Sequence, residues 1–116
     1  MKKSWEVEVS DEFRDWYEDL DLEEQASVIY SVEILRNGGP DTGQPHVDTV
    51  KGSRHNNMKE LRVQHRGHPF RILFAFDPRR MAYLILAGDK TGDSRWYETN
   101  VPRADDIYDR HLLETG

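Results

Sequence analysis

The chain has 116 residues, no cysteine and a formal net charge of −6 at pH 7. This length suits one domain with one core and is too short for two, so we expect a single domain over residues 1–116. The missing cysteines exclude disulfides and thiolate metal sites and fit a cytoplasmic protein. Acidic residues interrupt the N-terminal segment, unlike in a signal peptide. The longest apolar run, 81–87, is too short to span a bilayer.

The charge is distributed unevenly along the chain. Residues 1–50 carry 4 Lys/Arg against 13 Asp/Glu, residues 51–95 carry 10 against 4, and residues 96–116 carry 2 against 5. A basic middle between acidic ends indicates a site for a polyanion, because local potential steers a charged ligand. Chance clustering of acidic residues on the solvent faces of helices is the alternative.

Two helices are predicted in the first third of the chain, after a strand over 5–10 that alternates apolar and polar residues. Ser10 suits the N-cap of an amphipathic helix over 11–20. Asp21 with Glu24 predicts a capping box at the start of a second helix, which ends at the NGGP sequence. The apolar stripe of this second helix is expected at Leu22, Ala26, Ile29, Val32 and Leu35.

A long loop over 41–57 leads into three predicted strands. The segments at 58–64 and 70–76 alternate and flank a glycine-containing turn, which predicts a hairpin. Residues 81–87 are apolar throughout, as in a central strand. A last helix is expected from Pro102 onward. We therefore predict an α+β sandwich, in which an antiparallel sheet has the two N-terminal helices on one face and a C-terminal helix closes the chain.

Arg62 and Arg71 stand inside the predicted hairpin, where charged residues are unusual. Since their apolar neighbours face the helices, both arginines should project from the opposite face, which we expect to be uncovered. Neighbouring like charges destabilise a sheet, and only Glu60 lies close by in sequence. The pair therefore indicates a site for an anion such as phosphate, which the guanidinium fork binds well. Pairing with acids from elsewhere is the alternative.

Other basic residues could reach the same face. Lys90 follows the last strand, and Lys51, Arg54 and His55 belong to the preceding loop. These positions would complete an anion-binding surface.

Histidines and aromatic residues near the hairpin allow two interpretations each. His65 and His68 flank the turn and could transfer protons, or they could be solvated turn residues. Trp96 and Tyr97 could stack on RNA bases, or they could begin a helix that packs on the core. The histidine spacing is not that of a zinc site, and no P-loop, GxGxxG or GxSxG motif occurs, so we expect no metal or cofactor.

Between Lys59 and Gly92 the sequence resembles the RelE/ParE toxin superfamily, specifically its HigB-like, phage Gp49-related branch. The pattern is an ELR strand, a glycine turn, an aromatic-Arg-aliphatic strand, an apolar strand, a lysine and a helix that begins with proline. The matching positions are Glu60–Arg62, Gly67, Phe70–Ile72, Met81–Ala87, Lys90 and Pro102. The order of elements agrees along nearly the whole chain, which implies a RelE-like sandwich.

The resemblance implies the toxin of a type II toxin–antitoxin system, a ribosome-dependent endoribonuclease that cleaves mRNA and inhibits translation. It also implies a cognate antitoxin, of helix-turn-helix type and encoded nearby, together with contacts to mRNA and the ribosome and none to membranes. The catalytic candidates are Arg62, Arg71, Lys90, Tyr97, His65 and His68. The RNA-binding candidates are Lys51, Arg54, Lys59, Arg66, Arg79 and Arg80.

Two alternatives remain open at this level. A ParE-like toxin of the same fold would act on a target other than RNA, such as a topoisomerase. A catalytically silent relative would serve as an interaction module, as the acidic total charge and the single lysine after the last strand suggest. Fold alone does not separate these functions.

Overall fold

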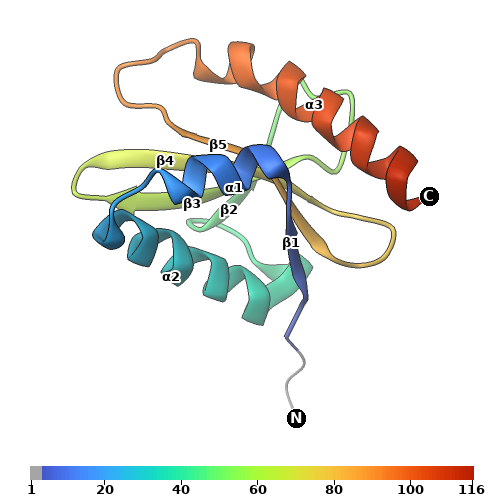
Figure 1. Ribbon diagram of the computed structural model, residues 1–116, viewed down its shortest axis with the longest axis horizontal. Coiled ribbons are helices and arrows are strands. Elements are labelled where there is room, and N and C mark those ends of the chain that lie inside the picture. The colour runs from blue at the N-terminus through green and yellow to red at the C-terminus, as the bar shows by residue number, and fades with distance from the viewer. Residues whose placement is uncertain (1–3) are drawn as a thin grey trace.

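The computed structural model describes residues 4–116, so Lys2 and Lys3 of the N-terminal segment lie outside the described residues. A central sheet is flanked by α3 on one side and by α1 and α2 on the other (Figure 1). The elements in chain order are β1 (Val7–Val9), α1 (Asp11–Glu18), α2 (Leu22–Gly38), the 3₁₀ helix η1 (Gly39–Asp41), β2 (Val47–Thr49), β3 (Lys59–His65), β4 (His68–Phe76), β5 (Ala82–Asp89) and α3 (Trp96–Thr115). Within the described part of the chain, no helix is long and apolar enough to cross a membrane.

The sheet has five strands in the order β1-β5-β4-β3-β2. Strands β2 to β5 pair with their neighbours in antiparallel fashion, whereas β1 pairs with β5 in parallel at the edge. The predicted α+β sandwich and its order of elements are confirmed. One strand was not predicted: β2 lies within the expected loop and pairs with β3 over only three residues.

Both predicted helix starts are confirmed by their caps. The Ser10 hydroxyl accepts a hydrogen bond from the Phe13 amide at 2.9 Å and donates to the carbonyl of Ile85 on β5. Asp21 and Glu24 form a reciprocal capping box, with distances of 2.8 and 2.9 Å. These bonds satisfy amides that have no partner within the first turn of a helix.

The predicted apolar stripe of α2 is partly wrong. The structure buries Val28, Ser31 and Leu35, whereas Leu22 is 83% exposed and Ile29 is 50% exposed. The helix contacts the sheet mainly along β3. Such a narrow contact covers a single row of residues, so the flanking apolar positions stay in solvent.

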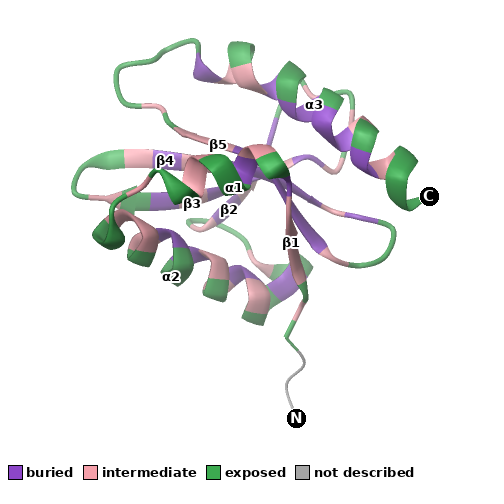
Figure 2. Cartoon of the chain, in the orientation of Figure 1, coloured by how far each residue is buried: buried purple, intermediate pink, exposed green. Residues whose placement is uncertain are grey.

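The expectation of an uncovered sheet face is also wrong, because hydrophobic residues are buried on both faces. Figure 2 shows buried residues in α3 and in α2, which lie on the two sides of the sheet. One cluster joins the sheet to α1 and α2, and the other joins it to α3. Strands β4 and β5 carry apolar residues on both faces, and such strands need cover on both sides. Helix α3 begins at Trp96, earlier than Pro102, which agrees with the interpretation that Trp96 and Tyr97 begin a helix that packs on the core, since Trp96 is buried in the second cluster.

Candidate functional site

The β3–β4 hairpin places Arg62 and Arg71 on one face, as the sequence predicted, and directly opposite each other. In the same antiparallel register Leu61 pairs with Ile72, so the arginines point to the α3 side and their apolar neighbours point to the α1 and α2 side. The side chain of Arg62 is 36% exposed and that of Arg71 is 14% exposed. Two positive charges that face each other across strands and are this far buried require a nearby anion.

Glu60, two residues before Arg62 on the same face of β3, supplies this anion. Its Oε2 accepts a hydrogen bond from Nε of Arg62 at 3.1 Å, and its Oε1 lies 4.0 Å from Nε of Arg71. The Tyr97 hydroxyl donates to Oε1 at 2.5 Å. Glu60 is only 5% exposed, and a carboxylate this deeply buried needs such partners in place of water. We call Glu60, Arg62, Arg71 and Tyr97 the Glu60 cluster.

Arg62 has a second acidic partner, Asp48 on β2, at 3.1 Å. The Thr49 amide and the Gln44 side chain, followed by Arg62, hold the pKa of Asp48 below its ordinary value. The alternative that acids from elsewhere neutralise the arginines is therefore correct for Arg62.

Arg71 is less fully satisfied. One terminal nitrogen donates to the carbonyl of Phe70 at 3.0 Å. Its Nε is buried and has no hydrogen-bond partner within the described chain. An unpaired buried donor is costly, so Arg71 is the arginine of the cluster whose hydrogen bonds are less complete.

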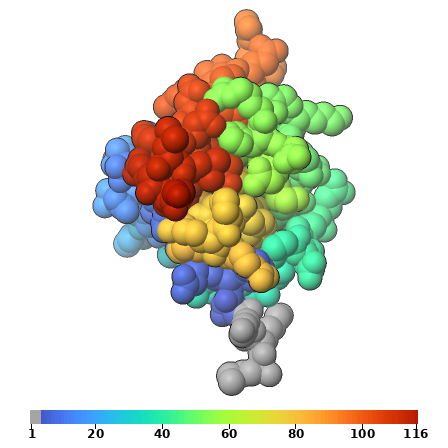
Figure 3. All heavy atoms as spheres, turned by 90° about the vertical axis from the view of Figure 1, so that its right-hand side faces the viewer, coloured from blue at the N-terminus to red at the C-terminus, as the bar shows by residue number. Residues whose placement is uncertain are grey.

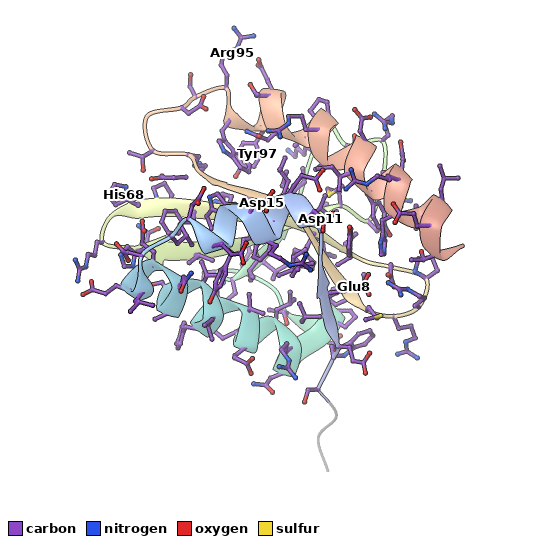
Figure 4. All side chains as sticks on the ribbon, viewed as in Figure 1. Glu8, Asp11, Asp15, His68, Arg95 and Tyr97 are labelled. Atoms are coloured by element: carbon purple, nitrogen blue, oxygen red, sulfur yellow. The ribbon has the colours of Figure 1, made fainter. Side chains whose placement is uncertain are left out.

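Lys90 lies next to Tyr97, at the border of the Glu60 cluster. The Lys90 ammonium is 5.4 Å from the centre of the Tyr97 ring, which is cation–π distance. Burial, and then the hydrogen bond to Glu60, raise the pKa of Tyr97, so its hydroxyl keeps its proton at neutral pH. Figure 4 shows Tyr97 between the first turn of α3 and the sheet.

The two candidate histidines lie away from the cluster. His65 Nδ1 is hydrogen-bonded to Ser27 of α2 at 2.7 Å, and its ring stacks on Phe70, on the opposite face of the sheet. His68 Nδ1 lies 3.1 Å from Asp89, and Figure 4 shows His68 at the tip of the hairpin. The structure therefore brings together Arg62, Arg71, Lys90 and Tyr97 but neither histidine.

Three of the six candidate RNA-binding cations, Arg54, Arg66 and Arg79, are already paired with acidic residues. Arg54 bonds to Asp106 and Asp109 of α3, at 3.1 and 2.5 Å. Arg66 pairs with Glu23 of α2. These pairs hold the loop after β2 against α3 and the hairpin turn against α2, and neither arginine reaches the Glu60 cluster.

Arg79 and Arg80 lie in the turn between β4 and β5, at the end of the sheet opposite the β3–β4 turn (Figure 1). Arg79 bonds to Asp77 at 2.8 Å and to Glu8 at 3.1 Å, and Arg80 lies over the Trp5 ring. Figure 3 shows this turn, in gold, between the C-terminal end of α3 and the N-terminal segment. Of the remaining candidates, Lys51 is exposed in its loop and Lys59 is half-buried at the start of β3.

A cleft of about 630 Å³ opens beside the arginines. We call it the α2–β3 cleft. Its lining comes from α2, from the segment before β2 and from the β3–β4 hairpin. The lining includes Ser27, Tyr30, Ser31, Arg62, Gln64 and Arg71.

Chemically, the Glu60 cluster and Lys90 combine three cations with a carboxylate and a neutral phenol. The cations can bind a phosphate, the carboxylate can accept a proton, and the phenol orients the carboxylate. Among residues 4–116, no three His, Asp or Glu side chains gather in a way that could hold a metal ion. Sequence reasoning missed Glu60 as a site residue, although its spacing of two from Arg62 in a strand placed both on one face.

Comparison with known proteins identifies the family. Residues 15–109 match the family described as "Phage derived protein Gp49-like (DUF891)". The chain belongs to the Gp49-like family. The predicted resemblance is thereby confirmed.

Curated relatives extend this Gp49-like assignment. HigB2 of Mycobacterium tuberculosis, named as a candidate toxin, is 46% identical over 101 residues, which cover 85% of this chain and 50% of HigB2. HigB3 of the same organism, also named as a candidate toxin, is 48% identical over 91 residues, or 78% of each chain. The chain thus spans about half the length of HigB2.

A solved structure confirms the RelE-like fold of this Gp49-like chain. The structure of the E. coli toxin RelE in the free state, with two arginines replaced by alanine, aligns with a TM-score of 0.60 over 86% of this chain and 97% of RelE. The two sequences are only 10% identical in this alignment, so the comparison concerns the fold alone.

Proposed function

We propose that this chain is the toxin of a type II toxin–antitoxin system and that it cleaves mRNA on the ribosome. The names of the Gp49-like relatives and the RelE-like fold support the toxin assignment. The observation that carries the nuclease is the Glu60 cluster, in which a partly unsatisfied Arg71 lies beside a buried carboxylate. The chain would act as one domain over residues 1–116, in the cytoplasm, without a metal.

The proposed reaction is attack of a ribose 2′-hydroxyl on the adjacent phosphate. Arg71 and Arg62 bind the phosphoryl oxygens, on which negative charge increases in the transition state. Arg71 contributes its guanidinium group, and Arg62 shifts from its bond to Asp48 toward the phosphate.

The proton transfers use the remaining members of the site. As the 2′-oxygen bonds to phosphorus, Glu60 takes its proton, and the bond from phosphorus to the 5′-oxygen breaks. Lys90 supplies a proton to the departing 5′-oxygen, which leaves a 2′,3′-cyclic phosphate and a 5′-hydroxyl. Tyr97 holds Glu60 in place through its 2.5 Å hydrogen bond. His65 and His68 have no part in this scheme.

An active toxin requires neutralisation, so we expect a cognate antitoxin of helix-turn-helix type, encoded nearby. Ribosome and mRNA would be the other partners. Lys51 and Arg66, which are exposed, stay candidates for RNA backbone contacts outside the cleavage site.

The test is to map mRNA 5′ ends after brief induced expression, with translation running or blocked. The native chain is compared with Arg71→Ala and Glu60→Gln. A matched control is Arg14→Ala on α1, since Arg14 is exposed and, among residues 4–116, forms an ion pair with nearby Asp11 alone, at 3.1 Å. We expect new 5′-hydroxyl ends within translated frames, reduced about 100-fold by loss of one cation at the phosphate and unchanged in the control.

Two outcomes would contradict the nuclease. DNA damage signalling without new mRNA ends would favour a ParE-like action on a topoisomerase. Absence of both, with an abundant folded protein, would favour the silent interaction module. The pairing of Arg62 with both Glu60 and Asp48 is the observation that supports this second candidate, because it lowers the positive charge offered to RNA.

A further inference from the structure

The α2–β3 cleft lies at a place where the sheet has an open edge. Strand β2 pairs with β3 only as far as Leu61, and one further bond joins the Arg62 amide to the carbonyl of His46 at 2.8 Å. Within the described chain, β3 then continues to His65 without a neighbouring strand on this side. The edge at Gln64 is therefore free to contact a ligand in the cleft.

One wall of the cleft carries a prominent aromatic residue. Tyr30 of α2 is 69% exposed, whereas Tyr83 and Tyr108 in the core are 5% and 2% exposed. Ser27 and Ser31 line the same wall, but the Ser27 hydroxyl is bonded to His65 and Ser31 is buried, so Tyr30 is the surface that this wall offers to a ligand. An exposed aromatic face suits a flat ligand.

The opposite wall carries positive charge. Arg62 and Arg71 line the cleft as well as belonging to the Glu60 cluster. A ligand that enters the cleft therefore has an anionic group at one end and a flat group at the other. The cleft volume of about 630 Å³ lies within the range typical of small-ligand sites.

We propose that the α2–β3 cleft seats a nucleobase of single-stranded RNA, next to the phosphate that Arg62 and Arg71 bind. Tyr30 is the stacking surface, and the Gln64 amide, a donor and an acceptor on one group, contacts the edge of the base. This inference rests on the proposed nuclease function and adds a specificity site to it. Tyr30 and Gln64 then determine which base beside the cleaved bond is accepted.

A peptide segment is the competing occupant, because an open strand edge can also pair with another strand. The arginine wall favours RNA, since successive nucleotides offer a phosphate and a base at fixed spacing. An acidic peptide would satisfy the arginines but would not require an exposed aromatic surface opposite them.

The experiment uses a trinucleotide of 2′-O-methyl ribonucleotides, which the proposed reaction cannot cleave. Backbone amide resonances of the purified protein are followed by NMR as the trinucleotide is added to millimolar concentration. The variants are Tyr30→Ala and Tyr30→Phe. The control is Leu22→Ala, because Leu22 is an 83% exposed apolar residue on the same helix and does not line the cleft.

We expect the amides of Tyr30, Ser31 and Gln64 to shift on titration. Tyr30→Ala should weaken binding about 5- to 150-fold, as loss of one stacking partner does for single-stranded RNA, while Tyr30→Phe and Leu22→Ala should bind as the native chain does. In cells, Tyr30→Ala should also broaden the base preference at the mapped mRNA ends.

Unshifted cleft amides, or equal affinity of the native chain and Tyr30→Ala, would overturn the subsite. Cleft amides that respond to an acidic peptide and not to the trinucleotide would overturn it in favour of protein docking. The nuclease is judged separately by Arg71→Ala. If mRNA ends depend on Arg71 while Tyr30→Ala leaves both affinity and base preference unchanged, the nuclease function is supported and the nucleobase subsite is refuted.

Discussion

Replacing Tyr97 with phenylalanine tests the Glu60 cluster through a single atom. The change removes the hydroxyl that donates to Glu60 at 2.5 Å, and it leaves the ring next to Lys90 and Trp96. A hydrogen bond to a charged group contributes about 1.5–3 kcal/mol. Because Tyr97 is half-buried, we expect the lower end, a loss of about 1.5 kcal/mol in the free energy of unfolding.

Urea denaturation of Tyr97→Phe, Glu60→Gln and the double variant measures this interaction directly. Glutamine keeps the shape of the side chain at position 60 and removes its charge. The two single effects should fail to add, with a coupling energy of about 1 kcal/mol. Additive effects would refute the hydrogen bond as a stabilising contact.

The pH dependence provides a second readout of the same bond. Burial and the bond to Glu60 raise the pKa of Tyr97 above 10.0, its ordinary value. Above pH 10 the unfolded chain loses this proton while the folded chain keeps it, so stability falls as the pH rises. Tyr97→Phe should make the fall less steep, although Tyr83 and Tyr108 contribute too because burial also raises their pKa. An unchanged slope would contradict this explanation.

Three further variants test the fold by chemical or thermal denaturation. Ser10→Ala should lower the free energy of unfolding by about 1–2 kcal/mol, because the first turn of α1 loses its cap, whereas an unchanged midpoint would refute the cap. Burial opposes ionisation of Asp77, but hydrogen bonds, first from His111, outweigh it and lower its pKa from 3.8. Asp77→Asn should therefore weaken the loss of stability as the pH falls below about 4, and an unchanged acid transition would contradict this. Gly88→Ala should cost about 1–3 kcal/mol, since its Cβ would lie 2.8 Å from Nε1 of buried Trp96, and native-like stability would show that the indole moves aside.

Local rules explain what the sequence predicted correctly. The caps at Ser10 and Asp21 need only residues within one turn. The register that sets Arg62 opposite Arg71 follows from strand alternation and a short turn. These features depend on neighbours along the chain, so their patterns are visible in the sequence.

Features that depend on distant contacts were not predicted. Packing between separate segments decides which side of α2 faces the sheet. It also decides that β2 forms and that β1 pairs with β5 in parallel. Asp48 reaches Arg62 only because β2 pairs with β3. For the same reason the sequence could not show that His65 bonds to Ser27 on the far face of the sheet.

The pairing of β1 with β5 has a consequence for how the chain folds. The bond from Ser10 to Ile85 closes a separation of 75 residues, and such long-range contacts form slowly because loop closure costs entropy before it yields contacts. Strands β3, β4 and β5 pair through neighbouring segments and can assemble earlier. Until β1 docks, the edge of β5 is exposed to pairing with other chains. Refolding should therefore have a slow late phase, with aggregation competing at high protein concentration.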